Sequence, residues 1–202
     1  MEQRTPEWFA KRLGLVTASR IADVMAKVKT GTAVSRSGYM AQLVTERLTR
    51  QPTEGYQSAA MEWGIEQEGA ARAAYEARTG VLVDEVDFVR HPTLEAGASP
   101  DGLVGEDGCT EIKCPNTATM LEYIEDRSVP RKYLLQIQWQ LACTGRNWCD
   151  FVAYDPRLPE HLQLLVIRVP RDEEVIEQIA AEVGRFVTEL RDRVEHLREL
   201  RL

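Results

Sequence analysis

Two acidic residues and a lysine are spaced so that a β-hairpin would bring them together. Asp101 lies just before a turn at residues 105–108, and Glu111 and Lys113 lie on the strand expected after it. Because side chains alternate along a strand, Glu111 and Lys113 share one face while Ile112 points into the core. We expect the hairpin to place Asp101 beside Glu111, so that two carboxylates and one ammonium converge at one end of a sheet.

Such a trio suits metal-assisted hydrolysis of a phosphodiester. Mg²⁺ prefers oxygen ligands, so Asp101 and Glu111 could hold it against a phosphate, where it activates a bound water. Lys113 could then orient that water or stabilise charge in the transition state. The same spacing also fits a strand with an ordinary exposed Glu/Lys face, so the pattern alone does not distinguish the two interpretations.

Cysteine and histidine usage argues against other metal chemistry. The four cysteines form no C-x-x-C pair, and the three histidines are scattered away from acidic clusters: Cys109, Cys114, Cys143, Cys149, His91, His161 and His196. We therefore expect no structural zinc or iron–sulfur site. Reduced, partly buried thiols are the expectation for a cytosolic protein.

The elements around the hairpin follow from hydrophobic periodicity and capping signals. A short helix, a turn around Gly14 and a second helix capped near Thr17 or Ser19 are expected first, followed by a loop at 31–38 and a helix from Tyr39. Further helices are expected at 59–78 (ended by Gly80), 117–126, 131–141 and 175–197, and strands at 81–89, 148–154 and 162–169. This order predicts an α/β fold, a mixed central sheet flanked by helices.

Composition favours a globular protein and says little about its partner. The chain has 202 residues, of which 44% are hydrophobic and 28% charged, and its formal net charge is −7. Residues 1–50 carry nine Lys/Arg against four Asp/Glu, so the remainder carries sixteen against twenty-eight. Because an acidic protein repels nucleic acid on average, any DNA contact must be focused on one face. No apolar run is long enough to predict a membrane span or a secretory signal, so we expect a cytoplasmic protein.

Several ordered segments resemble the lambda-type alkaline exonucleases, the YqaJ-type viral recombinase family of PD-(D/E)xK nucleases. The matching segments run from residue 8 to about 170: Trp8, Arg12-Leu13-Gly14, Thr17-Ala18-Ser19, Trp63-Gly64-Ile65-Glu66-Gln67-Glu68, Ala71-Arg72, Tyr75-Glu76, Ser99-Pro100-Asp101-Gly102-Leu103, Glu111-Ile112-Lys113-Cys114-Pro115, Gln136-Ile137-Gln138 and Tyr154-Asp155-Pro156-Arg157. The resemblance implies a restriction-endonuclease-like core. It divides 1–202, as one nuclease domain, into a helical DNA-end-binding part (about 1–58), a nuclease core (about 59–170) and a C-terminal helix (about 171–200).

The resemblance also implies roles for individual residues. Glu68, rather than Glu66, would join Asp101 and Glu111 at the metals, with the backbone carbonyl of Ile112 as a further ligand. Lys113 would act on the nucleophilic water. Gln136 would line the catalytic site, and Gln138 would contact DNA.

A second set of residues matches a pocket for a 5′-phosphate. Arg12, Ser19 and Ser99 would grip the phosphate, and Trp8 would stack near the terminal base. This sequence departs from the family pattern in one respect, because residues 116–119 offer no cation after Lys-Cys-Pro. The next candidates along the chain are Arg127, Arg131 and Lys132.

By resemblance, the chain is expected to be a Mg²⁺-dependent 5′→3′ exonuclease on double-stranded DNA that leaves 3′ tails, with Mn²⁺ as a possible substitute. A ring-shaped homotrimer would encircle the duplex and pass the tail to a single-strand annealing protein in phage-type recombination, in the cytoplasm of a bacterial host. Two alternatives stay open: a PD-(D/E)xK endonuclease or single-strand nuclease, and a catalytically silent DNA-end-binding scaffold.

Overall fold

The computed structural model describes residues 3, 5–29, 31–53 and 58–201. Its helices are α1 (Pro6–Arg12), α2 (Ile21–Val24), α3 (Val34–Thr49), α4 (Ala59–Thr79), α5 (Thr117–Asp126), α6 (Arg131–Thr144) and α7 (Glu173–Glu199), with 3₁₀ turns η1 (Ala18–Arg20) and η2 (Glu160–Leu162). Its strands are β1 (Val16–Thr17), β2 (Val89–Arg90), β3 (Ala96–Ala98), β4 (Gly102–Val104), β5 (Gly108–Lys113), β6 (Trp148–Tyr154) and β7 (Leu164–Pro170).

A mixed four-stranded sheet, in the order β4-β5-β6-β7, carries the expected hairpin. The β5–β6 pair is parallel and its two neighbours are antiparallel. Parallel neighbours need a crossover connection, and α5 and α6 provide it. In β6, Phe151, Val152 and Ala153 are fully buried, as expected for a central strand covered on both faces.

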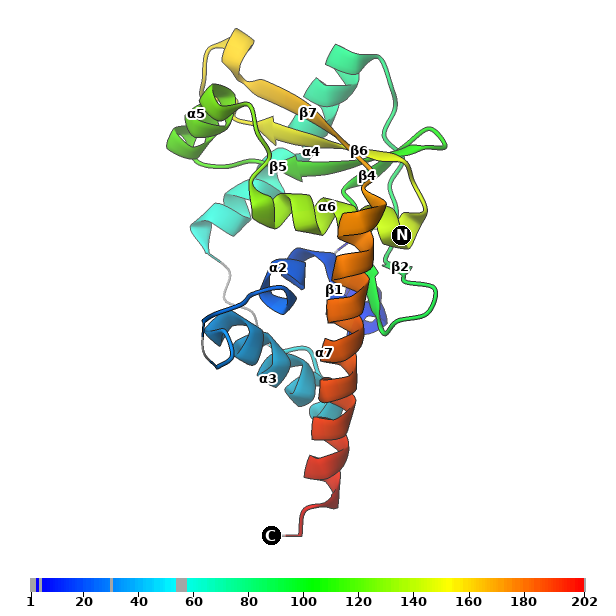
Figure 1. The fold of residues 1–202 in the computed structure, drawn as a ribbon. Coiled ribbons are helices and arrows are strands. Elements are labelled where there is room, and N and C mark those ends of the chain that lie inside the picture. The colour runs from blue at the N-terminus through cyan, green and yellow to red at the C-terminus, as the bar shows by residue number, and fades with distance from the viewer. Residues whose placement is uncertain (1–2, 4, 30, 54–57, 202) are drawn as a thin grey trace.

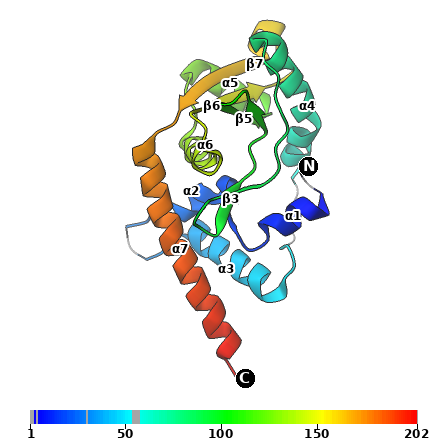
Figure 2. The ribbon, with the colours of Figure 1, turned by 90° about the vertical axis from the view of Figure 1, so that its right-hand side faces the viewer.

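Helices cover both faces of this sheet (Figures 1 and 2). On one face, Met120 of α5 and Ile137 of α6 belong to a buried cluster with Phe151. On the other face, Tyr75 of α4 packs in a cluster with Ile112. The strand β5 therefore separates two layers, and α4 and α6 approach it from opposite sides.

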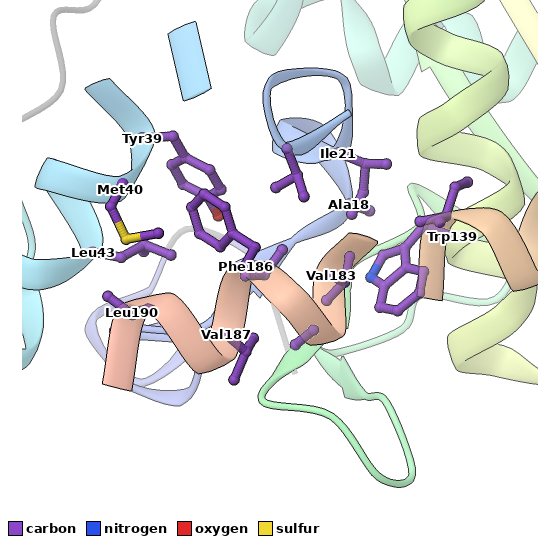
Figure 3. Packing of buried hydrophobic residues seen from close by; sticks show 14 of the residues in the cluster. Ala18, Ile21, Tyr39, Met40, Leu43, Trp139, Val183, Phe186, Val187 and Leu190 are labelled. Carbon is purple, nitrogen blue, oxygen red and sulfur yellow. The ribbon is translucent and has the colours of Figure 1, made fainter. Parts of the chain in front are cut away.

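A second region holds the N-terminal segments, the small sheet β1-β3-β2 and most of α7. The aromatic rings of Tyr39 and Phe186 stack with their centroids 5.7 Å apart where α3 meets α7 (Figure 3). The expected amphipathic C-terminal helix is confirmed. Its buried residues follow steps of three and four, with one adjacent pair at 186 and 187: Ile176, Ile179, Val183, Phe186, Val187, Leu190 and Val194. This helix runs well beyond the rest of the fold (Figure 1).

Two local expectations were wrong. Residues 81–89 do not form one strand, because the chain makes a single bridge from Asp84 to Leu103 and then crosses to the other sheet, where Phe88 packs with Trp8. Residues 31–38 are not all loop, since α3 already begins at Val34. A bidentate pair between Arg36 and Glu189 ties its first turn to α7.

None of the helices in the described part of the chain is long and apolar enough to cross a membrane.

Candidate active site

Glu111 lies at the centre of the site and is almost completely buried on β5, with 1% of its side chain exposed. Its Oε1 accepts a hydrogen bond from Gln136 Nε2 at 2.6 Å, and its Oε2 accepts one from Gln140 Nε2 at 2.5 Å. Both amides come from α6, where a spacing of four residues puts them on one helix face. The Lys113 ammonium also contacts Oε1. The buried carboxylate is therefore held by three donors, which offsets the cost of burying its charge.

Asp101 lies beside Glu111 through the pairing of β4 with β5. Its backbone N–H donates to Thr110 O at 3.1 Å, and its Oδ2 accepts from Ile112 N at 2.6 Å. The pKa of Asp101 is raised to about 8. Burial is the main cause, and the negative charge of Glu111 is the second. Both effects disfavour the ionised carboxylate, and a bound cation would reverse the second.

Lys113 remains a cation in this setting. Burial acts to lower its pKa, but the neighbouring charges of Glu111 and Asp101 outweigh burial, so the pKa of Lys113 is raised. The ammonium also lies 5.3 Å from the ring centroid of Tyr133. Because a lysine with a raised pKa does not give up its proton at neutral pH, Lys113 is suited to orienting a nucleophile or stabilising negative charge rather than to acting as a base.

Glu68 approaches from α4 on the other side of the sheet edge. Its charge contributes to the raised pKa of Asp101, and its Oε1 lies 3.6 Å from Arg72 Nη2. The Arg72 guanidinium also donates to the backbone carbonyl of Asp101 at 3.2 Å, so it connects α4 to the hairpin. Glu66, by contrast, is exposed.

The chemistry of these donors fits a divalent cation. Asp101 and Glu111 offer carboxylate oxygens side by side, and a cation would relieve the repulsion by Glu111 that, after burial, raises the pKa of Asp101. Within the described ranges, no three His, Cys, Asp or Glu side chains are grouped closely enough to hold a metal ion. Glu68 therefore does not form a closed triad with the other two, and Lys113 covers Glu111 instead.

The structure brings together three of the four residues expected around a 5′-phosphate. Trp8 Nε1 donates to Ser99 Oγ at 3.0 Å, and the Arg12 guanidinium carbon lies 3.9 Å from the centroid of the Trp8 ring. Ser99 is only two residues before Asp101, so this group borders the carboxylates. Ser19 is exposed, and its Oγ lies 3.5 Å from Thr17 Oγ1.

Two expected DNA contacts do not fit the arrangement. Trp8 is only 6% exposed, packs with Leu15 and Phe88, and has Arg12 over its ring, so it does not offer a face to a base. Gln138 is buried away from the carboxylates. Its amide donates to Pro170 O at 2.8 Å, and its oxygen accepts from Asp172 N at 2.9 Å, which fixes the start of α7.

Gln140 and Arg72 were absent from the expected site. The sequence did contain a signal for Gln140, because a spacing of four residues from Gln136 predicts a shared helix face. That a buried carboxylate would lie opposite this face could not be inferred before α6 was placed on the sheet.

The fold and the site together define a class of protein: a mixed α/β protein with a paired-carboxylate and lysine centre at a sheet edge, whose donors suit phosphodiester hydrolysis. Comparison with known proteins narrows this class. Residues 7–147 match the model of the YqaJ-like viral recombinase domain, so the chain belongs to that family.

Solved structures agree with this assignment. An alkaline exonuclease (LHK-Exo) from Laribacter hongkongensis is 50% identical, with a TM-score of 0.90 over 96% of both chains. The structure of LHK-Exo in complex with dAMP matches at 51% identity with the same score and coverage. A phage-related exonuclease from Haemophilus somnus 129PT, 12% identical, shares the fold with a TM-score of 0.75 over 91% of this chain and 96% of its own. A search of curated proteins gave no match.

Proposed function

We propose that this protein is a Mg²⁺-dependent 5′→3′ exonuclease that degrades one strand of double-stranded DNA and leaves 3′ single-stranded tails. The observation that carries the proposal is the convergence of Asp101, Glu111 and Lys113 at one sheet edge, with Glu111 held by two amides. Membership of the YqaJ-like family and the 50% identity to an alkaline exonuclease support nuclease chemistry on DNA.

Each residue then has a defined task. Asp101, Glu111 and the Ile112 carbonyl would hold the cation, with Glu68 completing its ligands from α4; Mn²⁺ fits the same oxygen donors. When bound, the cation polarises the phosphodiester and lowers the pKa of a water. Gln136 orients the Glu111 carboxylate, and the Lys113 ammonium stabilises negative charge at the phosphate.

The group formed by Arg12, Trp8 and Ser99 would select a 5′-phosphorylated end. The structure of a 51% identical relative with dAMP, a nucleotide 5′-phosphate, supports the binding of a terminal phosphate in this family. Trp8 serves this pocket by packing, since its indole N–H fixes the Ser99 hydroxyl and its ring supports Arg12. Ser19 would add a second hydroxyl from the turn after β1.

The biological setting is part of the same proposal. A single nuclease domain would assemble as a homotrimeric ring around the duplex, with basic N-terminal residues facing the channel, and would deliver its 3′ tail to a single-strand annealing protein in the cytoplasm of a bacterial host. A native mass spectrum that shows a monomer at working concentration would exclude the ring.

The function is tested with three DNA substrates in Mg²⁺: linear duplex with a 5′-phosphate, the same duplex with a 5′-hydroxyl, and a closed circle. Fast loss of the phosphorylated linear strand with the circle intact is the expected result. Cutting of the circle would indicate an endonuclease, and preference for single strands would indicate a single-strand nuclease. Binding of duplex ends without any hydrolysis would indicate a silent scaffold.

A further inference from the structure

A fully buried aspartate holds an arginine just after the end of β6. The Asp155 carboxylate, 0% exposed, accepts from Arg157 Nε at 2.7 Å and from Arg157 Nη2 at 3.0 Å. It also accepts from the Thr117 hydroxyl at 2.7 Å. The Arg157 side chain itself is 45% exposed. Because a two-point contact fixes the plane of a guanidinium, the fold sets the direction of Arg157 before any ligand arrives.

The Arg157 guanidinium also contacts the segment that follows the catalytic strand. Its Nη2 donates to the backbone carbonyl of Pro115 at 3.1 Å. Pro115 is two residues after Lys113, so the Cα atoms of these two residues are at most roughly 7 Å apart. The guanidinium carbon lies 4.5 Å from the ring centroid of Trp63, on the helix that carries Glu68. Arg157 therefore lies between that helix and the end of β5.

Residues 116–119 contain no cation where the family pattern has one, and the sequence offers three other cations as substitutes. Arg127, Arg131 and Lys132 are all exposed, and Lys132 lies over the ring of Tyr133 at 4.6 Å. None of them makes a hydrogen bond to residues 113–119 within the described part of the chain. Arg157 does so through Pro115, and its guanidinium is also paired with a buried carboxylate.

We propose that Arg157 binds a backbone phosphate of the DNA strand within about two nucleotides of the scissile phosphate. The inference rests on the proposed function, since it takes the scissile phosphate to lie at Lys113. Because the Arg157 guanidinium contacts Pro115, two residues after Lys113, it lies near enough to reach a phosphate one or two nucleotides from the scissile one. Arg157 Nη1 makes no hydrogen bond to any residue that the structure describes, and this edge of the guanidinium is the one offered to the phosphate.

Salt-dependent binding gives the first test. Affinity for 5′-phosphorylated linear duplex is measured in EDTA for the full-length wild type and Arg157→Gln over a range of salt concentrations. Binding weakens as salt rises, so the slope of log K against log salt is negative. Loss of one phosphate contact should reduce the magnitude of this slope by about 0.9 and weaken binding about tenfold. Arg168→Gln is a matched control. Arg168 likewise pairs with a buried aspartate, Asp150, at 2.9 Å and stands 3.5 Å from the centroid of a tryptophan ring, but it lies on β7.

A chemical double-mutant cycle gives the second test. Single uncharged methylphosphonate linkages are placed at each of the first four positions of the duplex strand. One position within two nucleotides of the cleavage point should weaken wild-type binding about tenfold and leave Arg157→Gln binding unchanged, because the variant has already lost that contact. An equal penalty in both proteins at every position, or a salt slope of Arg157→Gln equal to that of Arg168→Gln, would overturn the proposal.

A second variant keeps the proposal testable if Arg157→Gln does not fold. Arg157→Gln leaves Asp155 buried without its partner, whereas Asp155→Asn/Arg157→Gln removes both charges together. The double variant should show the same lowered slope. Because binding is measured without divalent cation, a lowered slope in a protein that never cleaves DNA would leave the subsite standing while refuting the nuclease. Normal cleavage of DNA with an unchanged salt slope would support the nuclease and refute the Arg157 subsite.

Discussion

Gln140 offers a sharp test of how the site holds its central carboxylate. Gln140→Leu keeps the approximate volume of the side chain but removes the amide that donates to Glu111 Oε2 at 2.5 Å. A hydrogen bond to a charged group contributes about 1.5–3 kcal/mol. If the whole of that energy is needed to hold Glu111 in the transition state, the rate falls roughly ten- to hundredfold.

The same substitution should also lower stability. The other amide atom, Gln140 Oε1, is buried without a hydrogen-bond partner among the described residues. Leucine removes this unsatisfied acceptor, which offsets part of the cost of leaving Glu111 Oε2 buried without its donor, so the free energy of unfolding should fall by about 1–3 kcal/mol. For a chain of this length, that corresponds to a fall in Tm of about 2–12 °C.

The assay is single-turnover digestion of 5′-phosphorylated linear duplex at saturating Mg²⁺, together with thermal unfolding of the same samples. Gln138→Leu, two positions along α6, is the control because Gln138 bonds Pro170 and Asp172 rather than Glu111. It should lower Tm and leave the rate of the folded protein unchanged. A rate for Gln140→Leu within threefold of wild type would refute the reasoning, as would an equal loss of rate in the two variants.

Three further predictions follow from the site and its surroundings. Glu111→Ala and Lys113→Ala should each lower the rate at least about a hundredfold while duplex binding in EDTA is kept; near-normal activity of either would mean that the site is wrongly assigned. Arg12→Ala should reduce the preference for 5′-phosphorylated over 5′-hydroxyl ends, and an equal loss on both ends would deny it a phosphate role. His91 stacks on Trp139 at 4.8 Å, and burial lowers its pKa, so the unfolded chain binds its proton more readily. The stabilisation from neutral His91 is complete above about pH 6.5 and is lost as pH falls below it, so His91→Gln should show a smaller drop in Tm between pH 6.5 and 5 than wild type; parallel curves would contradict this.

Local patterns in the sequence were sufficient for most of the elements around the site. The run from Ala59 is a helix that ends at Gly80 in the left-handed conformation, as its C-terminal glycine predicted. Alternation along β5 correctly put Ile112 in the core and Glu111 with Lys113 on one shared face; the structure shows that Ile112 packs in the cluster with α4 and that Glu111 meets α6. These features depend on residues close together in the chain, where backbone geometry fixes the side-chain direction.

The mixed α/β class and the family were also determined by the sequence, because ordered motifs spread over most of the chain carry them. Long-range packing decided the rest. Residues 81–89 alternate like a strand, yet the chain crosses from one sheet to the other after the bridge at Asp84. Trp8 has the residue type of a stacking platform, yet it is buried beneath Arg12.

Contacts between distant segments of the chain could not be predicted from the sequence in two further cases: the two amides that hold Glu111, and the contact of Arg157 with Pro115. Gln136 and Gln140 are separated from Glu111 by part of a crossover connection, and Arg157 reaches the end of β5 from the segment that follows β6. Sequence fixes which side chains share a helix or strand face, since that depends on local periodicity. Which buried charge such a face meets depends on how the helices dock on the sheet, and only the tertiary structure decides that.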